Sequence, residues 1–133
     1  MAASAHAAAL IDTDVLIDAA RGHSDAVAFL SSQYRASGVQ ISIISAMELI
    51  AGSRNQIELG EIKRFLLPAR VLAIDSNVSQ AAYNFMESFT LSHGLMIPDA
   101  LIAATASEND LTLVTKNTRH FQMIPELEIV RPY

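Results

Sequence analysis

The sequence predicts an α/β domain built on a mainly parallel sheet, and three observations support this. Short apolar runs alternate along the chain with longer segments whose apolar residues recur at helical spacing. Hydrophobic residues make up 51% of the 133 residues and charged residues 17%, which is typical of a folded domain. The length allows one hydrophobic core of ordinary size. We therefore expect a single domain over residues 8–133, preceded by a flexible extension at residues 1–7.

The first half of the chain predicts a strand, two helices, a strand and two further helices. The strands are apolar runs, and the helices carry apolar residues three or four positions apart between capping residues and glycines. Ser24 is the expected cap of the second helix, and Ser45 forms a capping box with Glu48 at the start of the third. Pro68 ends the fourth helix. In order, these segments are 8–12, 13–20, 24–37, 39–44, 45–52 and 55–67.

The second half predicts a strand, two helices and two more strands. Asp75 or Ser76 caps a long helix with an apolar stripe typical of core packing, and Gly94 ends that helix. Pro98 begins the next helix, a position where proline is favoured. The final strand alternates polar and apolar residues, which favours an edge position with one solvated face. In order, these segments are 71–75, 76–93, 98–109, 111–115 and 126–130.

Composition excludes several classes of function. Without cysteine, the chain cannot form disulfides, thiolate zinc sites, iron–sulfur clusters or a cysteine nucleophile. No apolar run approaches the roughly 20 residues of a membrane span, and no secretory signal is recognisable, so we expect a cytoplasmic protein. The formal charge of −5 disfavours nucleic-acid binding through a broadly basic surface. An enzyme whose carboxylates bind divalent cations escapes this objection, because the bound ions invert the local charge.

Acidic side chains gather where the expected strands end. Asp12 ends the first strand and is followed by Thr13 and Asp14, Glu48 lies in the helix after the second strand, and Asp99 lies near the start of a later helix. Open parallel sheets bind ligands beyond the carboxyl ends of their strands. Clustered acids repel one another and raise one another's pKa values, and a divalent cation removes that cost. Oxygen ligands without a nearby histidine favour Mg²⁺ or Mn²⁺ over zinc.

Most of these acids also have a purely structural interpretation. Glu48 is explained by a capping box, Asp99 by the helix macrodipole, and Asp14 by capping of the first helix. Asp18 is interpreted as part of a solvated helical face. Asp12 fits a structural role least well, because an ionisable group directly after an apolar strand is costly without compensating charge or hydrogen bonds.

Four segments together resemble the PIN-domain ribonucleases, and within them the VapC-type toxins of toxin–antitoxin systems. These segments are LIDTDVLID (10–18), SAMELIAGS around Glu48, IPDALIAATA around Asp99, and LVTKNTRHF (113–121). The resemblance implies a PIN-like three-layer α/β/α sandwich with the strand order 3-2-1-4-5. It also implies that Asp12, Glu48 and Asp99 are the catalytic, metal-binding acids of a metal-dependent endoribonuclease.

In the mechanism that this resemblance implies, one or two Mg²⁺ or Mn²⁺ ions activate water for in-line attack on an RNA phosphodiester. Asn117 stands where many PIN domains have a fourth acid, which leaves the number of metal ions open. The residues expected to orient water or carboxylates around the metal are Asp14, Thr13, Thr115 and Asn117. The residues expected to contact RNA are Arg21, Arg54, Lys116 and Arg119.

The resemblance further implies a homodimer and a VapB-type antitoxin, whose C-terminal segment fills a groove near the active site. The helices expected at 45–52 and 55–67 are rich in large apolar residues, which suits such a groove and suits the core equally well.

Three other functions stay open from the residues. The start IDTDVL also fits an aspartyl-phosphate phosphotransferase of the haloacid-dehalogenase class, with Asp12 as nucleophile and Asp14 as general acid, but the acidic pair that this class needs late in the chain is missing from 111–133. A signalling receiver domain would use Asp75 as phosphoacceptor and leave Glu48 without a role. A catalytically silent PIN fold that only binds RNA or protein is the third alternative.

Overall fold

The structure, a computed structural model, describes residues 8–133, which contain a five-stranded sheet in the order β3-β2-β1-β4-β5. All four pairs of neighbouring strands are parallel. The strands are β1 (Ala9–Ile11), β2 (Gln40–Ser42), β3 (Arg70–Leu72), β4 (Thr112–Val114) and β5 (Ile129–Val130). The predicted strand order is confirmed, and β5 lies at an edge as expected. The extension predicted at residues 1–7 lies outside the described residues.

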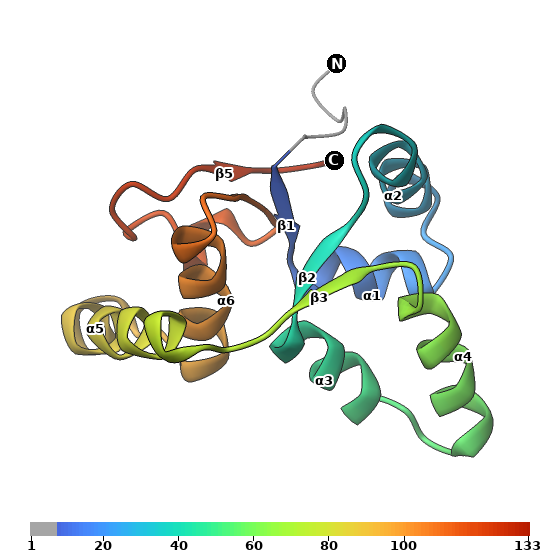
Figure 1. Ribbon diagram of the computed structural model, residues 1–133, viewed down its shortest axis with the longest axis horizontal. Helices are drawn as coiled ribbons and strands as arrows, with labels where there is room; N and C mark the ends of the chain where they lie inside the picture. The colour runs from blue at the N-terminus through green and yellow to red at the C-terminus, as the bar shows by residue number, and fades with distance from the viewer. Residues whose placement is uncertain (1–7) are drawn as a thin grey trace.

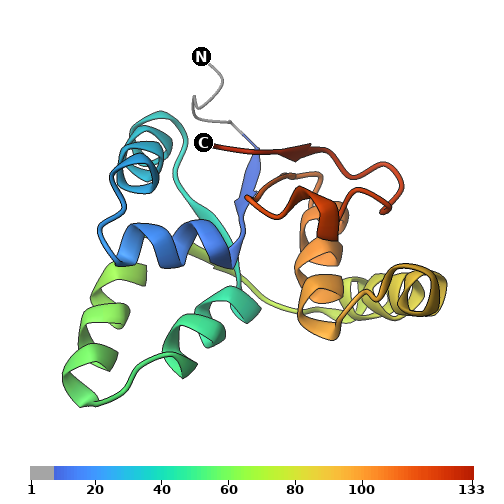
Figure 2. The ribbon, with the colours of Figure 1, turned by 180° about the vertical axis from the view of Figure 1, so that it is seen from behind.

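Helices cover both faces of this sheet and give three layers (Figure 1). The helices are α1 (Thr13–Ala20), α2 (Ser24–Ala36), α3 (Ile43–Ala51), α4 (Gln56–Leu66), α5 (Ser76–His93) and α6 (Ile97–Glu108), with a 3₁₀ turn η1 (Thr118–His120). The group α1, α2 and α4 lies on one side of the sheet and the pair α5 and α6 on the other, as the view from behind also shows (Figure 2). None of the helices within residues 8–133 is long and apolar enough to cross a bilayer.

The central strand β1 belongs to two cores, one on each face of the sheet. Ala9 and Ile11 pack with residues of α1, α2 and α3, whereas Leu10 packs with residues of α5 and α6. All three side chains are buried. Burial on both faces is why the first strand reads as a continuous apolar run rather than an alternating one.

Two predicted helix starts are wrong. Helix α3 begins at Ile43, and its cap is Ser42, whose Oγ accepts a hydrogen bond from the Ile44 amide at 3.0 Å. The predicted capping box of Ser45 and Glu48 does not form, because both residues lie inside α3. In α2, Ser24 is already helical, and the preceding His23 caps the helix instead.

The cap and the end of α5 are as predicted. Asp75 accepts a hydrogen bond from the Val78 amide at 2.8 Å, and Gly94 ends the helix in the left-handed conformation with φ of 68°. Strand β3, however, ends at Leu72 rather than at Asp75. Asp75 is therefore a helix cap separated from the strand end, which does not suit the phosphoacceptor role of a receiver domain.

Candidate active site

Asp12 is a buried carboxylate at the carboxyl end of β1, with 5% of the residue exposed. Its Oδ2 accepts a hydrogen bond from Thr115 Oγ1 at 2.8 Å, although the two residues are 103 positions apart. Its Oδ1 accepts a hydrogen bond from the Thr13 amide at 2.8 Å. Burial, together with the nearby charge of Asp14, raises the pKa of Asp12 to about 7 despite these hydrogen bonds. As the sequence indicated, the negative charge of Asp12 is therefore energetically unfavourable in the folded domain.

Asp14 is bound by the same loop after β4. Its Oδ2 accepts a hydrogen bond from the Lys116 amide at 2.9 Å and lies 3.4 Å from Thr115 Oγ1. The Asn117 amide in turn donates to Thr115 Oγ1 at 3.0 Å. Burial raises the pKa of Asp14 above its ordinary value. The two acids that bracket the start of α1 are therefore oriented by three consecutive residues from the far end of the chain.

Glu48 is tied to the start of α1 by hydroxyl groups. Its Oε1 accepts a hydrogen bond from Thr13 Oγ1 at 2.6 Å, and Ser45 Oγ lies 2.8 Å from the same hydroxyl. Ser45 is fully buried. Ser45, which was predicted as a helix cap, thus belongs to the hydrogen-bond network around Thr13, a role that its place in the sequence did not indicate.

Asp99 lies in the first turn of α6 and faces the other acids. Burial raises its pKa, the charge of His120 opposes that shift, and the charges of Glu48 and Asp14 add to it. His120 Nδ1 lies 3.5 Å from Asp99 Oδ2. The expectation that no histidine lies near these acids is therefore wrong, and the place of His120 in the loop after the fourth strand was a signal that it would reach this edge of the sheet.

Of the predicted RNA-contacting residues, Lys116 is engaged in an ion pair, whereas Arg119 is exposed. Lys116 Nζ forms an ion pair with Asp18 Oδ2 at 2.5 Å, a partner that the prediction of Asp18 on a solvated face did not include. The reason is that the loop after β4 reaches α1, a contact between distant segments that helical spacing does not reveal. Arg119 is exposed on η1, and the exposed Asn117 directly precedes that turn.

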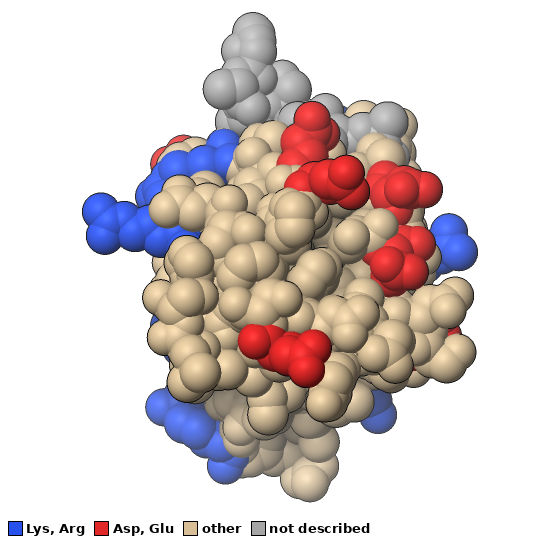
Figure 3. Space-filling model, turned by 90° about the vertical axis from the view of Figure 1, so that its left-hand side faces the viewer, with Lys and Arg blue, Asp and Glu red and all other residues tan. Residues whose placement is uncertain are grey.

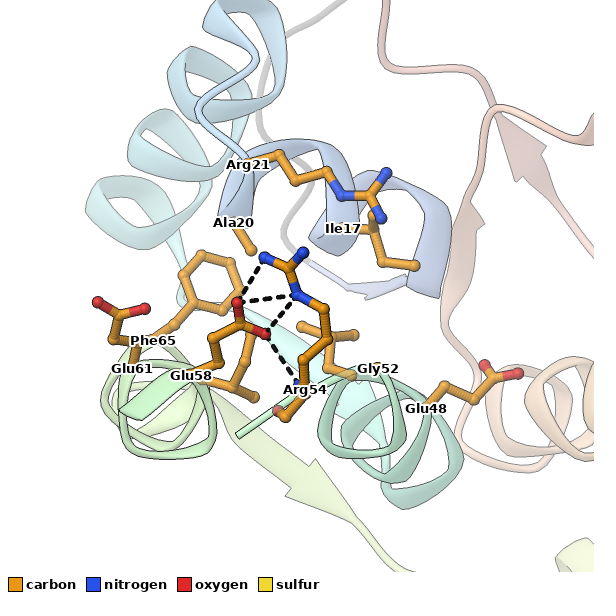
Figure 4. A pocket seen from close by; sticks show the side chains of 12 residues that line it. Ile17, Ala20, Arg21, Glu48, Gly52, Arg54, Glu58, Glu61 and Phe65 are labelled. Carbon is orange, nitrogen blue, oxygen red and sulfur yellow. Dashed lines mark hydrogen bonds and ion pairs between the residues drawn. The ribbon is translucent and has the colours of Figure 1, made fainter. Parts of the chain in front are cut away.

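A groove of about 570 Å³ lies beside Glu48, between α1, α3 and α4. Its apolar lining includes Ile62 and Phe65 of α4. Figure 4 shows Glu48 at one end of the groove and Glu61 at the other, with Arg54 between them. Arg54 forms an ion pair with Glu58 at 2.6 Å, and Arg21, another predicted RNA contact, lines the groove from the end of α1.

The family model of the PIN domain matches residues 9–127 of this chain. The chain belongs to the PIN-domain family. A curated relative, Ribonuclease VapC10 of Mycobacterium tuberculosis, is 38% identical over 120 residues, which cover 90% of each chain. Ribonuclease VapC19 of the same organism is 34% identical over 122 residues, which cover 90% of this chain and 96% of the relative.

Solved structures agree with this assignment. A chain in a structure described as a toxin–antitoxin complex from Klebsiella pneumoniae has a TM-score of 0.78 and 30% identity, and the match covers 94% of this PIN domain and 98% of that chain. The three-layer sandwich predicted from the sequence is therefore the fold of the family.

The acids of this PIN domain suit a hard divalent cation. Within residues 8–133, no three Asp, Glu or His side chains are arranged to enclose an ion directly. Mg²⁺ does not need such an enclosure, since it keeps several waters and binds through one or two carboxylates. Asp12, Asp14 and Asp99 all have raised pKa values, because burial outweighs the hydrogen bonds and positive charges around them. A bound cation would offset the remaining cost of their negative charges.

Proposed function

We propose that residues 8–133 act as a single PIN-domain endoribonuclease that hydrolyses RNA phosphodiesters with Mg²⁺ or Mn²⁺. The observation that carries this proposal is the gathering of carboxylates with raised pKa values at one end of the sheet. The relatives named as VapC ribonucleases support it. They also support a role as the toxin of a toxin–antitoxin pair, for which we propose a cytoplasmic location.

Asp12, Glu48 and Asp99 are the proposed metal-binding acids. The bound ion would supply a water of lowered pKa and would stabilise negative charge on the phosphate. Two threonines orient these acids: Thr115 donates to Asp12 at 2.8 Å, and Thr13 donates to Glu48 at 2.6 Å. These hydrogen bonds fix the acids before substrate binds, which lowers the cost of assembling the site.

RNA binding would use Arg21, Arg54, Lys116 and Arg119 as contacts to the phosphate backbone. Two of them are engaged in ion pairs, Arg54 with Glu58 and Lys116 with Asp18. Exposed ion pairs contribute little free energy, so a phosphate can replace the carboxylate of Glu58 without a large penalty. We therefore retain Arg54 as a contact that changes partner when RNA binds.

A VapB-type antitoxin is the proposed partner, with one of its segments in the groove between α1, α3 and α4. The solved relative in a toxin–antitoxin complex supports this partnership. The groove combines an apolar lining with the Arg54–Glu58 pair, and the buried hydroxyl of Ser53 has no hydrogen-bond partner within residues 8–133. A bound segment could supply that partner. Substitution Phe65→Ala should weaken antitoxin binding in co-purification, and unchanged binding would argue against this location.

The oligomeric state implied by the family is a homodimer. Chromatography with light scattering on the isolated protein should give twice the mass of one chain. A monomeric mass would contradict this proposal and would leave the assignment of the catalytic acids intact.

The cleavage activity is tested by incubating RNA with the protein and Mg²⁺, with and without a chelator. Asp99→Asn should reduce the rate by at least about a hundredfold while the domain stays folded. Asp110→Asn is the matched control, because Asp110 lies before β4, at the opposite end of the sheet, and its φ of 54° suits asparagine. A folded and fully active Asp99→Asn protein would remove the proposal.

A catalytically silent PIN fold is the second candidate, and Asn117 at the fourth acidic position favours it. Under this alternative the protein binds RNA in the presence of Mg²⁺ and leaves it intact. The same assay separates the two candidates.

A further inference from the structure

Tyr133 packs against the loop that follows β4. Its hydroxyl donates a hydrogen bond to Asp18 Oδ2 at 2.7 Å, and the same carboxylate forms the ion pair with Lys116 Nζ. The ring of Tyr133 stacks on the ring of His23 at 5.2 Å, and Lys116 Nζ lies 5.7 Å from its centre. The side chain of Lys116 is therefore held between an aromatic ring and a carboxylate.

The backbone of Lys116 is held as well. Its carbonyl accepts a hydrogen bond from a guanidinium nitrogen of Arg131 at 2.6 Å, and its amide donates to Asp14 Oδ2 at 2.9 Å. Arg131 also donates to the carbonyl of Tyr133 at 3.4 Å. Side chain, carbonyl and amide of one residue thus all have partners, and two of those partners come from residues 131–133.

Lys116 and its neighbour Thr115 also bind two acids at the proposed active site. Lys116 binds Asp14 through its amide, and the preceding Thr115 binds Asp12 through its hydroxyl. Carboxylates in a metal-dependent site must be placed to within about 0.5 Å, whereas unrestrained surface loops move over larger distances on the nanosecond to microsecond scale. A loop that orients two acids therefore needs an anchor of its own.

We propose that Asp18, Arg131 and Tyr133 form a clamp on Lys116 that positions the Lys116 amide against Asp14. All three are positioning residues, because they act on the reaction only through Lys116. This inference deepens the proposed nuclease function and rests on it. It also reassigns Lys116 from an RNA contact to a structural support of the site.

The test uses Tyr133→Phe, which removes one hydroxyl and keeps the ring. Amide hydrogen exchange at Lys116 should become about tenfold faster, because the restraint on the loop is weakened. In Mg²⁺-dependent RNA cleavage, kcat should fall about fivefold while KM stays within about twofold, since the substrate contacts are unchanged. Tyr83→Phe is the matched control, because Tyr83 is exposed on α5, and it should match the wild type in every measurement.

A second variant keeps the test decisive if Tyr133→Phe does not fold. Arg131→Gln removes the bond to the Lys116 carbonyl and should give the same pattern of faster exchange and lower kcat. In the double variant Asp18→Asn with Tyr133→Phe, the losses should not add, because both substitutions break the same chain of contacts.

Unchanged exchange at Lys116 in these variants would overturn the clamp. Faster exchange with an unchanged kcat would overturn the positioning role of the clamp. A raised KM with an unchanged kcat would overturn the reassignment of Lys116 and indicate that it contacts RNA. If the wild type cleaves no RNA at all, the proposed function fails, whereas the clamp itself is still judged by the exchange measurement.

Discussion

Asp12 links the stability of this domain to its proposed function. Its pKa of about 7, against an ordinary value of 3.8, results first from burial and then from the charge of Asp14. Between these two pH values the folded state holds a proton that the unfolded state has lost, so stability falls as the pH rises through this range. The site is thus destabilising when charged, which is the condition under which it can bind a cation.

Because the stability of the wild type falls as the pH rises, the effect of an Asp12→Asn substitution should depend on pH. The amide has no charge to bury, so the variant should melt at a higher temperature than the wild type at pH 8, by about 3 °C or more, and should gain less than half as much at pH 5. Added Mg²⁺ should raise the melting temperature of the wild type at pH 8 and leave the variant unchanged. Thermal melts at the two pH values check this, and an equal difference at both would contradict it.

The hydroxyl of Thr13 supports a second prediction at the residue scale, which concerns the rate of RNA cleavage. Thr13→Val keeps the shape of the side chain and removes the hydroxyl that contacts Glu48 and Ser45, so kcat should fall about tenfold, in line with the loss of a hydrogen bond to a charged group. Thr13→Ser keeps the hydroxyl and should retain most of the activity. Steady-state cleavage rates of both variants separate the hydroxyl from the packing, and equal losses would point to packing alone.

The sequence pointed to the acids at this end of the sheet and to two hydroxyl groups that bind them, those of Thr13 and Thr115, but not to all of their partners. Asp12 stood out because a carboxylate after an apolar strand has few structural explanations. Glu48 and Asp99 each had a structural explanation, and the resemblance to PIN domains assigned them to the site. Ser45 and His120 were missed because their contacts, with Thr13 and Asp99, depend on the relative placement of elements that are distant in the sequence.

At the scale of elements, the strongest local signals gave correct boundaries and the weaker ones did not. Gly94 ended α5 as predicted, because a left-handed residue is a specific stop signal. The boundary between β2 and α3 was misplaced because Ile43 and Ile44 are β-branched and extend the apolar run, although they belong to the helix. Packing of α3 against α1 overrides that local preference.

Gly94 supports a prediction at this scale. A Cβ at this position would meet no atom within 4 Å, so the cost of Gly94→Ala comes only from the left-handed backbone with φ of 68°. That cost is about 1 kcal/mol, and the melting temperature should fall by a few degrees. RNA cleavage at 25 °C should be unchanged, because α5 contributes no residue to the site. An unchanged melting temperature would show that the helix end relaxes.

At the scale of the whole molecule, the few basic side chains do not form one broad surface, so we expect RNA to be attracted only where they lie near the proposed site. On the face formed by α5 and α6, most of the visible surface is uncharged, and Lys and Arg lie at its margins (Figure 3). With a formal charge of −5 and Arg21, Arg54 and Arg119 as the remaining candidate RNA contacts, the protein should form few phosphate contacts. The logarithm of RNA affinity should therefore change with the logarithm of salt concentration with a slope no steeper than about −3. A much steeper slope would reveal a larger basic surface.

The central claim is that carboxylates from distant segments form one cation site at the carboxyl edge of the sheet. Paramagnetic broadening of backbone amide signals by added Mn²⁺ tests it most directly, because the ion broadens only the residues close to it. We expect selective broadening at Thr13, Glu48, Asp99 and Lys116, and its loss in Asp12→Asn. Broadening centred elsewhere, or none at Mn²⁺ concentrations that support activity, would contradict the account.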